Sequence, residues 1–164
     1  MIAGLTGAGK STYAERLAVE FQAVRLSLDE WNATLFFPDR DPASDFDWFY
    51  ERVQRCAAQM RATAEQILRA GTAVIFDCGF TNRAERQIFY DWANARNYSV
   101  QLHYLDVSPQ IRWQRTERRN AEKGATYALH VSREMFDFMH TIWEAPETEE
   151  LVAYSGLVVG GSEG

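Results

Sequence analysis

The sequence GLTGAGKST runs from Gly4 to Thr12. It fits the pattern G-x-x-x-x-G-K-[ST], in which backbone amides turn inward around phosphate oxygens. A side chain at Gly7 or Gly9 would hinder the positive φ angles and the close backbone approach that this wrap requires. The helix that follows such a loop also offers its positive N-terminal end to the anion. The sequence therefore predicts a loop that binds nucleotide phosphates, formed by Gly4, Thr6, Gly7, Ala8, Gly9, Lys10, Ser11 and Thr12.

Two side chains of this loop have chemical roles in the pattern. Lys10 would reach the β- and γ-phosphates, and the Ser11 hydroxyl would ligate Mg²⁺. The alternative is a glycine-rich turn that happens to precede a helix. We favour the phosphate loop because the stretch stands between a strand end and an amphipathic helix, as the pattern requires. The chain has no guanine-reading N-K-x-D string, which favours ATP over GTP. The expected cofactors are therefore ATP and, through Ser11, Mg²⁺.

Strands alternate with helices along the rest of the chain. We expect strands at 1–3, 24–28, 73–76, 100–106 and 157–159. Helices are expected at 11–21, along an apolar stripe from 46 to 67, at 83–97, from 109 onward and at 132–142. This alternation is typical of a parallel sheet covered on both faces. We therefore predict one α/β domain over 1–164, with three α/β/α layers and a mainly parallel sheet.

Some boundaries stay open at this stage. Only three residues precede Gly4, and a central strand is usually longer, so the sequence leaves open whether residues precede Met1. Gly71 is placed to end the long helix, and Ser108 with Pro109 to begin the helix from 109. The tail after Pro146 gives no clear pattern before 157.

Composition and charge exclude several classes of protein. Of the 164 residues, 46% are hydrophobic and 24% charged, a globular balance, and no apolar run is long enough to span a bilayer. The net charge of −6 argues against binding of long nucleic acids, which requires a basic stripe. Two cysteines, Cys56 and Cys78, form no metal-ligand spacing or disulfide framework. We expect a cytoplasmic protein without a membrane partner.

Two aspartates follow expected strands, where parallel strands open onto a site. Asp29 comes just after the second strand, and its carboxylate would take a proton from an attacking hydroxyl beside the γ-phosphate. Its alternative role is the N-cap of a helix that begins at Glu30. Asp77 ends the third strand and would lie near the water shell of the metal, with a strand-end turn residue as the alternative.

Four stretches together resemble a known family. They are GLTGAGKST, the Asp29 position, FDCGFTNRAERQIF and HYLDVSPQIRWQRTERRN. In this order they resemble the AAA_33-like P-loop kinases, which include polynucleotide 5′-hydroxyl kinases, zeta toxins and chloramphenicol phosphotransferase. The resemblance implies a P-loop NTPase fold of the nucleoside and small-molecule kinase type, with Asp29 as general base. It also implies a lid over the phosphates that carries Arg115, Arg118 and Arg119.

Two segments would then surround the acceptor. Arg112, Arg115 and Arg119 share one helix face, so we predict a lid at about 112–126, with Arg118 off that face. Guanidinium groups suit the spread charge of a transferring phosphoryl group, although a solvated basic face is the alternative. An irregular acceptor-side loop is predicted at about 36–45. Aromatic residues near it are explained by core packing or by an apolar wall for the acceptor.

One motif departs from the family. Thr81 and Asn82 resemble the T-N-x-x-x-R neighbourhood of the polynucleotide kinases, but we read the arginine as Arg83, directly after Asn82, which leaves its role open. The leading hypothesis is an ATP-dependent kinase of a small hydroxyl-bearing molecule, with Lys10, Asp29 and the lid arginines as catalytic groups. The alternatives are a polynucleotide 5′-hydroxyl or nucleotide-sugar kinase, and a nucleotide-hydrolysing switch. The acceptor and the oligomeric state stay open.

Overall fold

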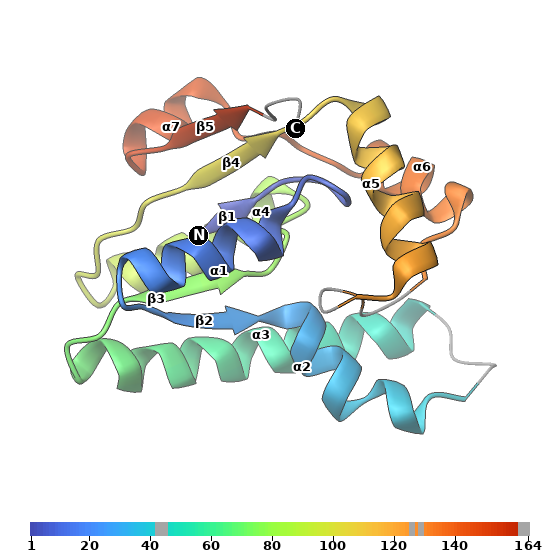
Figure 1. Cartoon of the computed structure of the whole chain (residues 1–164). Coiled ribbons are helices and arrows are strands. Elements are labelled where there is room, and N and C mark those ends of the chain that lie inside the picture. Colours follow the sequence, from blue (N-terminus) through green and yellow to red (C-terminus); the bar gives the residue numbers. More distant parts are fainter. Residues whose placement is uncertain (42–45, 125–126, 128–129, 161–164) are drawn as a thin grey trace.

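The computed structural model describes residues 1–41, 46–124, 127 and 130–160 (Figure 1). The strands are β1 (Ile2–Ala3), β2 (Val24–Ser27), β3 (Val74–Asp77), β4 (His103–Asp106) and β5 (Leu157–Gly160). The helices are α1 (Lys10–Glu20), α2 (Leu28–Leu35), α3 (Phe46–Arg69), α4 (Arg83–Asn94), α5 (Pro109–Glu122), α6 (Arg133–Thr141) and α7 (Thr148–Ala153), with a short 3₁₀ helix η1 (Phe37–Asp39).

The strands form a parallel sheet with β1 at its centre. β1 pairs with β4 and β4 with β5, while β2 pairs with β3, all in parallel. A parallel bridge between Ala3 and Gly79 and a hydrogen bond of 3.3 Å from Gly4 N to Gly79 O join the two groups. The resulting order is β2-β3-β1-β4-β5, so the carboxyl ends of the strands meet at one edge (Figure 1). The predicted parallel sheet is confirmed.

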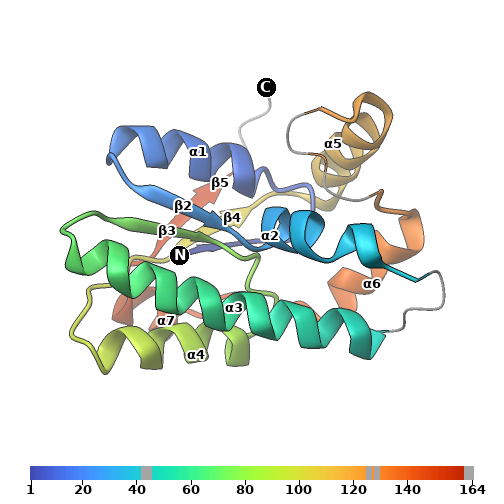
Figure 2. The same cartoon turned by 90° about the horizontal axis from the view of Figure 1, so that it is seen from below.

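Helices cover both faces of this sheet. α1 lies on one face, and α3 and α4 lie on the other (Figure 2). Side chains of β3 alternate between the two: Ile75 belongs to the apolar cluster of α1, and Phe76 to that of α3 and α4. Since successive residues of a strand point to opposite faces, one short strand contributes to both clusters. The three-layer α/β/α prediction is confirmed.

Several predicted boundaries are wrong by a few residues. β2 ends at Ser27, whose hydroxyl accepts from Glu30 N at 3.4 Å, so α2 begins at Leu28 and the N-cap alternative for Asp29 is wrong. The strand predicted at 100–106 begins only at His103, and the helix predicted at 83–97 ends at Asn94. Ser108 makes no side-chain cap hydrogen bond.

Two segments without a clear pattern contain regular structure. The loop predicted at 36–45 includes η1, and its residues 42–45 lie outside the described residues, as do 125–126 of the predicted lid. The tail after Pro146 contains α7 before β5. α3 ends at Arg69, just before Gly71 with φ 81°, as predicted.

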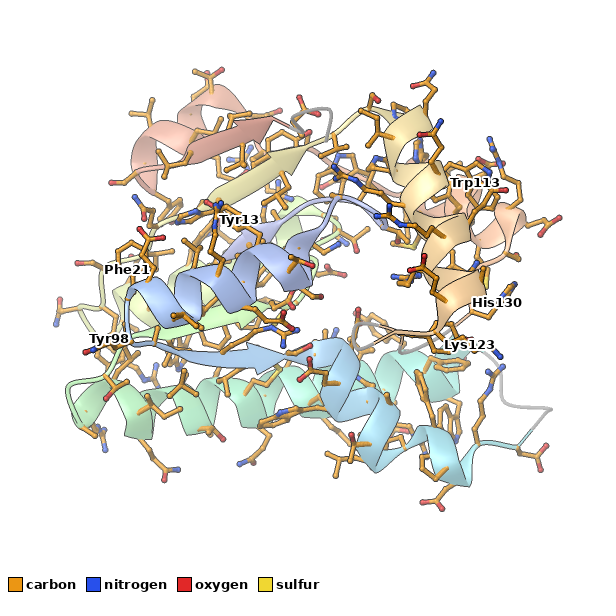
Figure 3. All side chains as sticks on the ribbon, in the orientation of Figure 1. Tyr13, Phe21, Tyr98, Trp113, Lys123 and His130 are labelled. Carbon is orange, nitrogen blue, oxygen red and sulfur yellow. The ribbon has the colours of Figure 1, made fainter. Side chains whose placement is uncertain are left out.

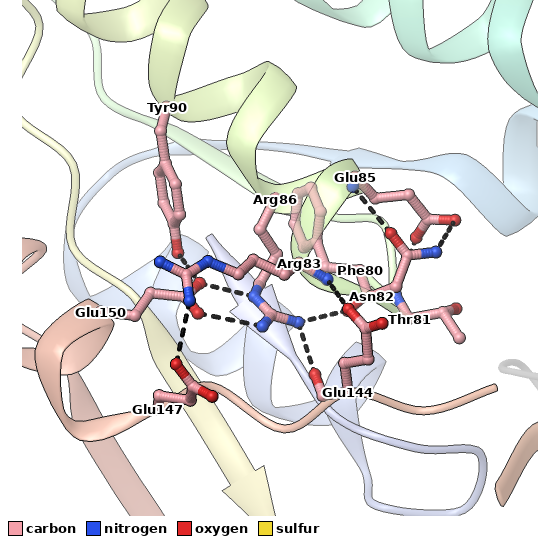
Figure 4. A network of polar contacts seen from close by, with 10 residues as sticks. All are labelled: Phe80, Thr81, Asn82, Arg83, Glu85, Arg86, Tyr90, Glu144, Glu147 and Glu150. Carbon is pink, nitrogen blue, oxygen red and sulfur yellow. Dashed lines mark hydrogen bonds and ion pairs between the residues drawn. The ribbon is translucent and has the colours of Figure 1, made fainter. Parts of the chain in front are cut away.

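The tail is fixed by a buried ion pair beneath α4 (Figure 4). Arg86 on α4 is fully buried and donates to both carboxylate oxygens of Glu150 on α7, at 2.6 and 3.0 Å. The Tyr90 hydroxyl donates to Glu150 at 2.8 Å, and Arg86 also donates to the carbonyl oxygens of Phe80 and Glu144 at 3.3 and 2.7 Å. Polar contacts between distant segments therefore hold the tail in place.

A buried histidine joins α1 to β4. Tyr13 on α1 points toward β4 (Figure 3), where its hydroxyl lies 2.7 Å from His103 Nδ1. His103 Nε2 lies 3.0 Å from Gln101 Oε1, which only accepts, so Nε2 carries the proton and Nδ1 accepts from Tyr13. Burial lowers the pKa of His103 to about 4. His103 is therefore neutral in the folded protein at neutral pH.

This histidine should make stability fall with acid. Unfolded His103 binds a proton below about pH 6.5, whereas folded His103 stays neutral down to about pH 4. The contribution of neutral His103 to the free energy of unfolding is complete above pH 6.5. It is lost at about 1.4 kcal/mol per pH unit as the pH falls toward 4. Urea unfolding at several pH values checks this. His103→Gln should flatten the dependence of the free energy of unfolding on pH, whereas His130→Gln, at an exposed position, should leave it unchanged. Equal pH dependence in the wild type and both variants would contradict the expectation.

Candidate nucleotide and phosphoryl-transfer site

The phosphate loop connects the central strand β1 to α1 at the carboxyl edge of the sheet. Gly7 and Gly9 have φ of 80° and 90°, and Gly9 is the N-cap of α1. The loop folds back on itself, because Ala8 N and Lys10 Nζ both donate to the Leu5 carbonyl oxygen at 3.1 Å. Ser11 follows in the first turn of α1. Because the first amides of a helix lack partners within it, this turn is suited to binding an anion.

α5 packs directly against the loop through Arg112. This buried guanidinium donates to Val107 O at 2.9 Å and to Thr6 O at 3.3 Å, and its Nη2 lies 2.6 Å from His140 Nε2 on α6. These contacts engage Arg112 with two backbone carbonyls and with α6. Arg112 therefore holds the loop in place through its own side-chain contacts.

Gly7 leaves no room for a side chain. A Cβ built at Gly7 would lie 2.2 Å from Arg112 O and 2.8 Å from Thr116 Oγ1, in addition to the positive φ. Gly7→Ala should therefore displace the loop, lower the free energy of unfolding by about 1–3 kcal/mol and weaken nucleotide binding at least about tenfold. Calorimetric titration with ATP and urea unfolding check both effects. Gly124→Ala is the control, since nothing lies within 4 Å there; a Gly7→Ala protein with normal affinity would contradict the expectation.

Four charged groups meet beside the loop. The charge of Lys10 interacts with those of Asp29, Asp77 and Arg119, and Asp29 interacts with the other three. Burial lowers the pKa of Lys10, against the effect of the two aspartates. Asp29 is exposed, and desolvation by the surrounding protein raises the pKa of its carboxyl group, against the effect of Lys10. Sequence-distant residues of α1, α2, β3 and α5 thus form one electrostatic cluster.

Asp77 lies buried at the end of β3 and is paired with Arg25 on β2. Arg25 Nε and Nη2 donate to the same Asp77 oxygen, at 3.1 and 2.8 Å, and Arg25 Nη1 donates to Glu30 at 2.6 Å. The second oxygen of the Asp77 carboxylate remains outside this ion pair. Arg25 was missed in the sequence because nothing in its strand distinguishes it from other polar strand residues.

The three predicted lid arginines differ in their surroundings. Arg115 faces the loop, since its Nη1 would lie 3.8 Å from a Cβ built at Gly9. Arg119 is half-buried and close enough to Asp29 to interact with its charge. Its Nε is the buried side-chain nitrogen that lacks a hydrogen-bond partner in the described part of the chain. Arg118 is exposed. The structure brings Arg115 and Arg119 to the loop side of α5.

Arg86 is a further residue that the sequence prediction missed. The interval from Thr81 to Arg86 fits T-N-x-x-x-R, so the arginine of this motif is Arg86, and the assignment to Arg83 was wrong. Counting the residues between Asn82 and the arginine would have identified Arg86 in the sequence. Arg83 instead lies at the surface, where it donates to Glu147 at 2.9 Å. Asn82 accepts from Glu85 N at 2.9 Å as the N-cap of α4.

In the ranges 1–41, 46–124, 127 and 130–160, no group of three or more His, Cys, Asp or Glu side chains is arranged to hold a metal by itself. The described helices include none with the length and apolarity required to cross a bilayer.

The fold and the loop together define a class. The chain has the fold of P-loop nucleoside triphosphatases. Its sheet is parallel in the order β2-β3-β1-β4-β5, and a phosphate loop connects the central strand β1 to α1. The AAA domain family model (AAA_33) matches residues 1–146, and the chain belongs to this family. Comparison with the sequences of curated proteins gave no match.

Solved structures with low sequence identity share this fold. Kti12 of Chaetomium thermophilum, in complex with ADP-AlF3, has 14% identity and a TM-score of 0.75, over 99% of this chain and 89% of that chain. A gluconokinase from Sinorhizobium meliloti 1021 has 15% identity and a TM-score of 0.66, over 99% and 82%. The Mycobacterium tuberculosis APS kinase CysC, in complex with AMPPNP and APS, has 16% identity and a TM-score of 0.63, over 99% and 87%.

Proposed function

We propose that this protein is an ATP-dependent kinase that transfers the γ-phosphoryl group to a hydroxyl of a small molecule. The observation that carries the proposal is the Asp29 carboxyl group beside the phosphate loop, with Lys10 and Arg119 as charged neighbours. A hydrolase needs only a positioned water, whereas transfer to an alcohol profits from a base close to the γ-phosphate. Asp29 fits that role.

The reaction would run as a single displacement. The acceptor oxygen forms a bond to the γ-phosphorus, the bond from that phosphorus to the ADP oxygen breaks, and the hydroxyl proton passes to the Asp29 carboxylate. Lys10, Arg115 and Arg119 would stabilise the charge that spreads over the phosphoryl oxygens. Arg118, exposed on α5, enters this set through the family resemblance alone.

The donor set beside the loop suits Mg²⁺. Mg²⁺ is held in P-loop proteins by one hydroxyl and the nucleotide phosphates and keeps several waters, so it needs no cluster of carboxylates. Ser11 in the first turn of α1 supplies the hydroxyl, and the Asp77 oxygen outside the Arg25 pair is suited to a metal-bound water. When bound, the ion would neutralise charge on the β- and γ-phosphates.

The comparisons support ATP and a kinase reaction. CysC is described with the ATP analogue AMPPNP and Kti12 with ADP-AlF3, and the gluconokinase and CysC are named as kinases. We propose that the segments at about 36–45 and 112–126 border the acceptor, as an acceptor-side loop and a lid. The acidic charge of −6 favours a small acceptor over a long nucleic acid.

One experiment tests the proposal directly. The protein is incubated with γ-labelled ATP, Mg²⁺ and a metabolite extract, and labelled products are separated and identified by mass spectrometry. A labelled phosphomonoester of a small alcohol is the expected product. Label found only in inorganic phosphate would favour the switch hypothesis, and label on added 5′-hydroxyl oligonucleotides would favour the polynucleotide kinase. Either outcome would reject the small-molecule kinase.

A further inference from the structure

Arg61 on α3 is a half-buried cation without a carboxylate partner in the described parts of the chain. Other arginines of the fold are paired, among them Arg25 with Asp77, Arg86 with Glu150, and Arg96 with Glu65. Arg61 instead lies with its Cζ 4.9 Å from the centre of the Phe89 ring on α4. The ring covers one face of the guanidinium, and the N–H donors at its edge make no hydrogen bond to a described residue.

The position of Arg61 connects it to the Asp29 cluster. Phe89 packs edge-to-face against Phe76 and Phe80, which flank the carboxyl end of β3, so Arg61 lies at the level of that strand end. The Cys78 thiol, directly after β3, interacts electrostatically with Asp29 and also with Arg61. Asp29 and Arg61 therefore approach the same strand end from α2 and α3.

An unpaired guanidinium in such a place is costly for the protein alone. Partial removal from water penalises a charge unless hydrogen bonds and an opposite charge compensate it, and burial indeed lowers the pKa of Arg61. The planar donor fork of arginine matches the oxygens of a phosphate or a carboxylate. A ligand anion at this position would supply the compensation that the described protein groups do not.

We propose that Arg61 binds an anionic group of the acceptor, so that the acceptor is a hydroxyl compound that carries a phosphate or a carboxylate. The inference rests on the proposed function for the position of the reacting hydroxyl at Asp29. Arg119 and Lys10 serve the phosphates of the donor, and Arg61 serves the anion of the acceptor. Two cationic regions would thus orient the two substrates on either side of Asp29.

Binding without turnover tests this inference separately from the kinase proposal. The protein is saturated with AMPPNP and Mg²⁺, and calorimetric titrations compare ribose 5-phosphate with ribose, and gluconate with glucose. The first pair probes a phosphate and the second a carboxylate. We expect at least one anionic compound to bind about tenfold or more tightly than its neutral partner, as a charged hydrogen bond would give. Arg61→Gln should abolish this preference, and Arg61→Lys should retain part of it.

Arg55→Gln is the matched control, because Arg55 is exposed on the same helix and pairs with Glu51. It should leave the preference unchanged. If the wild type shows no preference for either anion, or if the preference survives in Arg61→Gln, the inference is wrong and the kinase proposal stands. A loss of thermal stability in Arg61→Gln with unchanged preference would assign Arg61 a structural role and would equally overturn the inference.

Discussion

Asp29→Asn should lower the rate of phosphoryl transfer by about 10²–10⁴-fold, the range that a positioned general base contributes. Asparagine keeps the shape of the side chain but accepts no proton from the acceptor hydroxyl. The affinity for ATP should change little, because in the proposed site the loop, Lys10 and the α5 arginines would hold the phosphates. Transfer is measured with labelled ATP and the acceptor that the metabolite-extract experiment yields, and ATP binding by calorimetry.

Glu30→Gln provides the control for this change. Glu30 is the next residue on α2, its carboxylate is mostly exposed, and it pairs with Arg25. Its substitution removes the same charge from the same helix turn at a residue that pairs with Arg25 rather than with Lys10 or Arg119. We expect near-normal transfer from this variant. If a folded Asp29→Asn protein transfers phosphoryl groups at the normal rate, Asp29 is not the base. If both variants lose the same transfer activity, the loss reflects the change of charge rather than the loss of a base.

The pH dependence of transfer should carry the same information. Burial raises the pKa of Asp29 above that of an ordinary aspartate, although Lys10 acts in the opposite direction. A base is active only when deprotonated, so the rate should fall as the pH decreases through this raised pKa. The decrease of the transfer rate on the acid side should therefore occur at a higher pH than an ordinary aspartate would give. This decrease should be absent from the Asp29→Asn protein.

Local sequence was sufficient for the phosphate loop and for the layered fold. The loop is a contiguous stretch whose glycines are explained by positive φ angles and by close backbone approach. The alternation of strands and helices is typical of a parallel sheet. The same holds for Asp29, just after β2, and Asp77, at the end of β3, because the carboxyl ends of these strands meet at one edge. Their place in one electrostatic cluster follows from topology, which the element order already implies.

Other features depend on contacts between segments far apart in the chain. Arg25 becomes significant only through Asp77, which is 52 residues away in the sequence. The predicted end of the second strand, at residue 28, is one residue too late, because Ser27 is a buried strand residue that also caps α2. α7 has no strong apolar pattern of its own, and its Glu150 is explained by distant residues of α4, Arg86 and Tyr90, which are 64 and 60 residues earlier.

Arg86→Met should lower the free energy of unfolding by about 3–5 kcal/mol, the usual effect of removing one partner of a buried ion pair. Arg86 is 0% exposed and Glu150 is 5% exposed, so the substitution leaves the Glu150 carboxylate buried without its cation. The carbonyl oxygens of Phe80 and Glu144 also lose a donor. Urea unfolding measures the loss, and a protein that fails to fold at all would be consistent with it.

A second variant separates the buried charge from the loss of packing. Arg86→Met combined with Glu150→Leu removes both charges, and apolar replacement of a complete buried pair is often neutral or stabilising. The double variant should therefore recover much of the stability that Arg86→Met loses. Arg83→Met is the control, because its pair with Glu147 is exposed on both sides and should contribute no more than about 1 kcal/mol. Equal small effects at Arg86 and Arg83 would show that the T-N-x-x-x-R arginine does not anchor the tail, and its role would then have to be sought at the nucleotide site.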